Sequence, residues 1–140
     1  MYDSFKAVSD TAAALRIIVT GGRNYNDRDT VHRILAEYPG RHTLVNGACK
    51  VIDAHGRYHR PRSNEEPGAD RLATEYALGC GWDIAYYPPH WRQYGRAAGP
   101  VRNRWMVEDG ADLVIAFPGG SGTAHLVREA EKAGIPVRRI

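Results

Sequence analysis

Lysine is almost missing from this sequence of 140 residues. It occurs only as Lys6, Lys50 and Lys132, so nearly all of the positive charge is carried by arginine. The formal net charge of +3 is too small for a protein whose main task is to neutralise nucleic-acid phosphates. Arginine offers fixed, forked donors that suit individual phosphate or carboxylate groups. A GC-rich genome, which favours arginine codons, is the simpler explanation for most of these residues.

Cysteine is also scarce, and long apolar runs are absent. Cys49 and Cys80 make no disulfide framework. Residues 1–14 lack the continuous apolar core of a signal peptide, and no later run could span a bilayer. Cys49 with His55 and His59 does not have a zinc-site spacing. We therefore expect a cytoplasmic protein with no membrane partner, no metal ion and no cofactor.

Short apolar runs alternate with helical patterns along the chain. The runs predict five strands, at residues 16–20, 43–47, 83–87, 112–117 and 137–140. The helical patterns lie around residues 31–35, 68–79, 103–109 and 123–133. Such strands, apolar nearly throughout, predict an α/β fold: a Rossmann-like open parallel sheet of about five strands with helices on both faces.

The chain length fits one domain. Residues 1–15 are predicted to be an N-terminal arm, and residues 16–140 the folded domain. Within it, residues 48–67 are rich in Gly, Pro, Ser, Asn, Arg and His, which predicts a long loop. Such loops inside compact domains are usually functional or disordered. Residues 90–101 are predicted to be irregular as well.

A glycine-rich loop follows the most apolar strand and opens the last helix. Glycine lets backbone N–H groups approach a phosphate closely, and the helix N-terminus adds partial positive charge. The spacing matches neither the dinucleotide fingerprint nor the Walker A loop. The alternative is a turn that merely connects strand and helix. The predicted phosphate-binding residues are Pro118, Gly119, Gly120, Ser121, Gly122 and Thr123.

Further candidates fall at the same predicted sheet edge, where ligands bind in open α/β sheets. Arg23 can reach an anion or sugar, and Asp70 can accept ribose hydroxyls or simply stabilise its helix. The segment 91–106 offers aromatic and guanidinium groups for a base, sugar and phosphate, or else is a surface loop. The candidates are Gly21, Gly22, Arg23, Gly47, Gly68, Asp70, Arg96, Gly99, Arg102 and Asn103.

Several of these segments, taken in order, resemble a known family. They are TGGR at 20–23, NGA at 46–48 with GAD at 68–70, Trp91, YGRAAGPxRNxxM at 94–106 and PGGSGT at 118–123. Together they resemble the YspA/YpsA-like branch of the SLOG superfamily, of phage and actinobacterial type, over about residues 16–140. The resemblance implies a SLOG-type nucleotide-binding domain. Relatives include the LOG phosphoribohydrolases, which cleave the N-glycosidic bond of nucleoside monophosphates, and the DNA-processing protein DprA.

The sequence departs from the LOG pattern at its acid. LOG enzymes carry a catalytic Glu in this last helix, but the matching position is Leu126, and the nearest carboxylate is Glu129. Arg102 is the counterpart of the assisting Arg. If the protein is an enzyme, the candidate catalytic residues are therefore Arg102, Asp70 and Glu129. A second departure is the insertion at 48–67.

Three functions follow from these observations. The first is binding of a nucleotide or nucleotide-derived ligand with cleavage of its N-glycosidic bond. The second is a non-catalytic sensor or sequestering module for a nucleotide or an ADP-ribose-like signal, which Leu126 favours. DNA binding of DprA type ranks last, because the arginines of the long loop are few and lie next to Glu65 and Glu66. A homodimer would be ordinary for this class, since LOG proteins dimerise.

Overall fold

Five short strands form one parallel sheet in the order β3-β2-β1-β4-β5, in a computed structural model that describes residues 13–53 and 55–140. The predicted α/β, Rossmann-like architecture is confirmed. The strand order reverses between β1 and β4, and parallel sheets of this kind bind ligands at such a point. The strands are β1 (Arg16–Thr20), β2 (Thr43–Asn46), β3 (Asp83–Tyr86), β4 (Leu113–Ala116) and β5 (Val137–Arg139).

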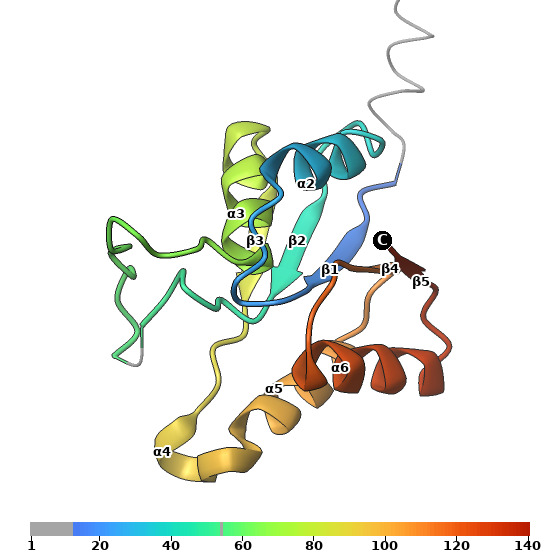
Figure 1. Ribbon diagram of the computed structural model, residues 1–140. Helices are drawn as coiled ribbons and strands as arrows, with labels where there is room; N and C mark the ends of the chain where they lie inside the picture. Colours follow the sequence, from blue (N-terminus) through green and yellow to red (C-terminus); the bar gives the residue numbers. More distant parts are fainter. Residues whose placement is uncertain (1–12, 54) are drawn as a thin grey trace, which may run out of the picture.

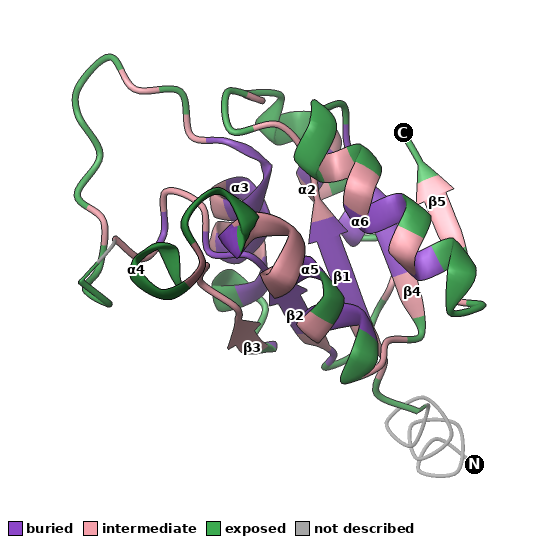
Figure 2. Cartoon of the chain, turned by 90° about the horizontal axis from the view of Figure 1, so that it is seen from below, coloured by how far each residue is buried: buried purple, intermediate pink, exposed green. Residues whose placement is uncertain are grey.

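Helices cover both faces of the sheet (Figure 1). Along β1 the side chains alternate, so Ile17 packs in the core under α2 and α3, while Ile18 packs in the core under α5 and α6. Figure 2 shows the central strands buried between these layers. The helical elements are α2 (Arg28–Leu35), α3 (Ala69–Gly79), α4 (Trp91–Tyr94), the 3₁₀ turn η1 (Gly95–Ala97), α5 (Ala98–Glu108) and α6 (Ser121–Lys132).

The segment before β4 is more helical than its sequence predicts. Residues 90–101 were expected to be irregular, with a helix only from residue 103, but α4, η1 and α5 follow one another from Trp91 to Glu108. The prediction was wrong because a segment rich in Arg, Gly and aromatic residues can still be helical when its backbone has partners. Pro100 is the third residue of α5, and an N–H at that position has no partner within the helix.

The two segments predicted to be least regular are partly described. Residues 1–12 of the predicted arm lie outside the described residues, and 13–15 are neither helix nor strand. In the described part of 48–67 there is no helix, and only the bridge between Ile52 and Tyr58 is sheet-like. Nowhere in 13–53 or 55–140 is there a helix with the length and apolarity needed to cross a membrane.

Candidate functional site

The glycine-rich loops that follow β1 and β4 pack directly against each other. The Gly22 N–H donates a hydrogen bond to the Pro118 carbonyl (2.8 Å). A Cβ added to Gly119 would lie 2.8 Å from the Gly22 nitrogen and 3.0 Å from the Gly21 carbonyl carbon. These distances leave no room for a side chain at Gly119. The close approach of the two loops therefore requires glycine, and it builds a floor at the switch point of the sheet.

A cavity of about 440 Å³ lies over this floor. Its volume falls in the range of small-molecule sites. Besides predicted residues it is lined by Cys49, Trp91 and Met106. The predicted residues that line it come from five separate segments: Gly21, Gly22, Arg23, Gly47, Asp70, Gly99, Arg102, Asn103, Gly120, Ser121, Gly122 and Thr123.

Four predicted ligand-binding residues do not line this cavity. Pro118 and Gly119 border a different hollow, beside α6 and β5, and Gly119 acts through loop packing. Gly68 adopts a positive φ of 81° and lies against the Arg23 backbone, so its role in the described structure is to pack the loop. Arg96 is exposed on η1.

Glu129, predicted as a candidate carboxylate, is not brought to the cavity. The N-terminus of α6 faces the cavity, and Glu129 lies eight residues further on, about 12 Å along the helix axis from Ser121. Its Oε1 lies 3.4 Å from His125 Nε2, and it borders a separate hollow against α5. Leu126 is fully buried in the core with Ile18 and other apolar residues. Helical geometry thus turns both positions away from a bound ligand.

Arg102 is anchored at the ends of two strands. Its Nη1 donates hydrogen bonds to the carbonyls of Gly47 (2.9 Å) and Tyr87 (3.3 Å), which follow β2 and β3. A Cβ on Gly47 would overlap the guanidinium, so glycine there makes room for the cation. Burial lowers the pKa of Arg102, while the nearby Asp70 raises it. The guanidinium is consequently held as a partly desolvated cation in the cavity wall.

Asn103 joins α5 to the glycine-rich loop of α6. Its buried amide nitrogen donates a hydrogen bond to the Gly122 carbonyl (3.1 Å) and lies 3.2 Å from His125 Nδ1. Its amide oxygen accepts from Arg102 Nε (2.9 Å). One side chain therefore positions both the loop and the arginine. His125 was missed by sequence reasoning, because Asn103 lies on another helix and no local pattern links the two residues.

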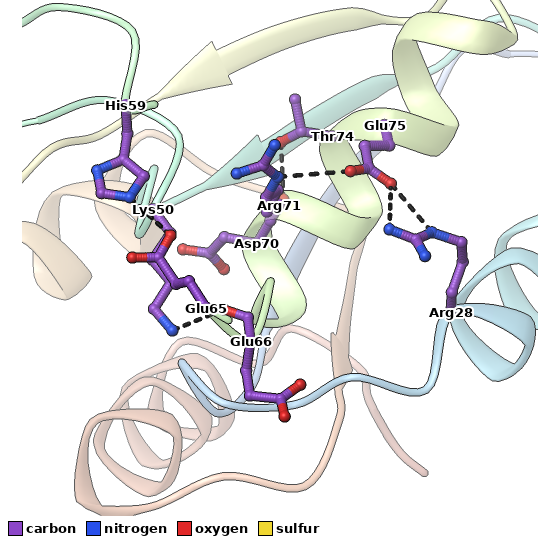
Figure 3. A network of polar contacts seen from close by, with 9 residues as sticks. All are labelled: Arg28, Lys50, His59, Glu65, Glu66, Asp70, Arg71, Thr74 and Glu75. Atoms are coloured by element: carbon purple, nitrogen blue, oxygen red, sulfur yellow. Dashed lines mark hydrogen bonds and ion pairs between the residues drawn. The ribbon is translucent and has the colours of Figure 1, made fainter. Parts of the chain in front are cut away.

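Asp70 is a buried carboxylate in the first turn of α3. Its Oδ2 accepts a hydrogen bond from the Cys49 N–H (3.0 Å). Its carbonyl accepts from the Thr74 hydroxyl (2.7 Å; Figure 3), which in turn accepts from the Asn46 amide (2.9 Å). Burial raises the pKa of Asp70 to about 6, against the Cys49 hydrogen bond and the Arg102 charge, which lower it. The carboxylate is held at the end of β2 with a titration close to neutral pH.

The raised pKa of Asp70 predicts a specific dependence of stability on pH. Between about pH 4 and pH 6 folded Asp70 keeps a proton that the unfolded chain releases. Its contribution to the free energy of unfolding therefore falls as pH rises through this range and is constant above it. Asp70→Asn removes this contribution. In urea unfolding at several pH values, the stability of wild type minus variant should decrease from pH 4 to pH 6; parallel curves would contradict the assignment.

Comparison with known proteins places the chain in a family. No family model matches the sequence. The Gene 61 protein of Mycobacterium phage D29 is 36% identical over 129 residues, which cover 87% of this chain and 93% of that protein. The chain belongs to the Gene 61 protein family.

Solved structures resemble this Gene 61 family member in fold. TM1055 superposes with a TM-score of 0.55 and 18% identity over 88% of this chain and 72% of TM1055. The C-terminal domain of the PF1911 hydrogenase from Pyrococcus furiosus gives a TM-score of 0.46 and 14% identity over 94% of this chain and 98% of that domain. At 18% identity the first likeness shows a shared fold, and the second is too weak to add to it.

Proposed function

We propose that this protein binds a nucleotide or nucleotide-derived small molecule, with a phosphate against Gly120–Thr123. The observation that carries the proposal is the N-terminus of α6, which opens into the cavity without a side-chain cap. The first N–H groups of a helix have no partner within it, and the helix dipole favours an anion there. The hydroxyls of Ser121 and Thr123 supply further donors beside these N–H groups.

The charges around the cavity support the same ligand. Arg102 and Arg23 line it and can pair with phosphate oxygens, for which the planar guanidinium is well suited. Asp70 lines it as well and can accept the hydroxyl groups of a ribose. The site thus offers cations for an anionic group and a carboxylate for hydroxyl groups. A nucleoside phosphate carries both kinds of group.

The finer family assignment belongs to this proposal. We assign the chain to the YspA/YpsA-like branch of the SLOG superfamily on its ordered segments TGGR, GAD and PGGSGT. Each of these three segments contributes to one cavity, which Gly21, Gly22, Asp70 and Gly120 all line. The phage origin of the Gene 61 relative is consistent with the assignment.

A binding panel tests the proposal directly. Isothermal titration with AMP, GMP, CMP, UMP and ribose 5-phosphate should show saturable binding of at least one of them, weakened by inorganic phosphate as competitor. Mass spectrometry of denatured protein should identify any nucleotide retained through purification. Binding by none of the panel, together with no retained nucleotide, would refute the proposal.

Cleavage of the N-glycosidic bond is the second candidate function, and the shared placement of Asp70 and Arg102 favours it. With a pKa of about 6, Asp70 is mostly ionised at pH 7 and can stabilise positive charge developing at the anomeric carbon. Water would add to that carbon, releasing the free base and ribose 5-phosphate. Chromatography should detect freed base with wild type and not with Asp70→Asn. No freed base from any bound nucleotide would leave binding as the function.

A further inference from the structure

A second hollow of about 300 Å³ adjoins the proposed phosphate cavity. The two are adjacent, because five residues line both of them: Arg23, Gly47, Cys49, Trp91 and Arg102. On one side of these shared residues lies the N-terminus of α6. On the other side lies Ile52, in the loop between β2 and α3. A ligand held at α6 that extends past the shared residues would therefore reach the loop.

The part of the loop that faces this hollow is folded. Ile52 and Tyr58 form an antiparallel bridge, and the His59 N–H donates a hydrogen bond to the Val51 carbonyl (2.8 Å). Val51 itself is buried, with 5% of its surface exposed. The described residues of the loop thus fold back on themselves and are anchored in the protein by the buried Val51. The loop presents a fixed wall to the hollow.

Two basic side chains that border the hollow, Lys50 and His59, have partners within the protein. Lys50 Nζ donates hydrogen bonds to the Glu66 carbonyl (2.7 Å) and to Asn24 Oδ1 (3.2 Å), and His59 Nε2 lies 2.8 Å from Glu65 Oε2 (Figure 3). The His59 partner lowers the pKa of Glu65, which keeps that carboxylate ionised.

A second carboxylate completes this polar rim. Asp53 accepts the backbone N–H groups of His55 (2.8 Å) and Arg57 (3.0 Å), which lower the pKa of its carboxyl group. The ionised Asp53 and Glu65 therefore both border the hollow. Two carboxylates disfavour a further phosphate in this hollow, in contrast to the α6 side.

Apolar side chains line another part of the hollow. Ile52, Pro88, Pro89 and Trp91 line the hollow, and Trp91 is 49% exposed, so its ring is accessible. Rings stack favourably on aromatic side chains and pack against proline and isoleucine. A planar, uncharged ring with polar edges fits these walls. Its faces would pack on the apolar side chains, and its polar edge would face the polar rim.

We infer that this hollow receives the base of the bound nucleotide, so that the loop between β2 and α3 decides which base is accepted. The inference rests on the proposed function, because the phosphate at α6 defines the other end of the ligand. The ribose then lies between the two, beside the shared residues Arg102 and Cys49. Selectivity among bases comes from the loop, while the glycine-rich loops hold the phosphate that all nucleotides share.

Comparing nucleotides with ribose 5-phosphate tests the inference, because the sugar phosphate lacks only the base. The best of AMP, GMP, CMP and UMP should bind about tenfold more tightly than ribose 5-phosphate, as expected for one stacked base. In methyl NMR of the wild-type protein, the Ile52 δ1 methyl resonance should shift with that nucleotide and stay in place with ribose 5-phosphate. This measurement needs no variant.

Two substitutions at Ile52 add an independent readout. Ile52→Ala should reduce the advantage of the nucleotide over ribose 5-phosphate about threefold, and Ile52→Trp, which fills the hollow, should abolish it. Ribose 5-phosphate should bind both variants as it binds wild type. Arg60→Ala is the control, because Arg60 is exposed on the same loop and does not border the hollow. Arg60→Ala should change neither the affinity for the nucleotide nor the affinity for ribose 5-phosphate.

The outcomes separate this inference from the proposed function. If ribose 5-phosphate binds but no nucleotide binds more tightly, or the Ile52 methyl resonance does not move, the base subsite is wrong and the phosphate site stands. The same holds if the Ile52 variants weaken both ligands equally. If neither ribose 5-phosphate nor any nucleotide binds, the proposed function itself fails.

Discussion

Arg102→Ala is expected to weaken the binding of every phosphate-bearing ligand by about a hundredfold. One charge-assisted contact contributes roughly 1.5–3 kcal/mol, and the substitution also removes the group that holds the cavity wall. In the folded protein this guanidinium bridges the carbonyls of Gly47 and Tyr87 and the amide of Asn103. The loss of affinity should be similar for ribose 5-phosphate and for nucleotides, because both carry the sugar phosphate that Arg102 is proposed to contact. Isothermal titration measures it.

Arg104→Ala is the matched control for this experiment. Arg104 lies two residues further along α5, is exposed, and does not line the cavity. The Arg104→Ala substitution removes the same charge from the same helix, so a general electrostatic effect on affinity would appear in both variants. Circular dichroism should show that both proteins fold. Unchanged affinity in a folded Arg102→Ala variant would exclude the guanidinium from the ligand site.

Gly119→Ala is expected to lower the free energy of unfolding by about 2 kcal/mol, in the usual range for an overpacked contact. Its methyl group would press on the backbone of Gly21 and Gly22 and on the Thr123 hydroxyl. Backbone atoms cannot move aside as a flexible side chain does, so the two loops must separate. Urea unfolding measures the loss of stability, and ligand affinity should fall with it because the floor of the cavity is displaced.

Gly120→Ala provides the comparison at the next residue. A Cβ on Gly120 meets nothing within 4 Å, so alanine adds no contact with the neighbouring loop. The stability of this variant should stay close to that of wild type. An equal loss in both variants would show that glycine is needed here for a reason other than the packing of the two loops.

The fold could be predicted from the sequence because its signals are local. Apolar β-branched runs such as Arg16–Thr20 have to be buried on both faces, and this alone calls for a parallel sheet covered by helices. Glycine clusters at strand ends marked the edge of the sheet at which Gly21 and Gly120 line one cavity. The start of α5 was misplaced because the residues around Gly99 and Pro100 show no helical pattern in sequence, although α5 begins at Ala98.

The parts of the site that depend on long-range contacts could not be predicted. Glu129 was a reasonable candidate by distance along the chain, yet the direction of α6 carries it away from the cavity. The contact between Asn103 and His125 joins two helices, and no local pattern encodes it. The meeting of Ile52 with Pro88 and Pro89 depends on how the long loop folds back, which composition does not specify.

The hydrogen bond from Gly22 to Pro118 has a consequence for folding kinetics. It joins residues far apart in the sequence, and the strands before them, β1 and β4, pair across the same long separation. Contacts between residues so distant in sequence slow the folding reaction. The cavity needs both loops in place, so a ligand of this site would bind only the completed fold. Such a ligand would slow unfolding and raise the melting temperature, without acting as a template for folding.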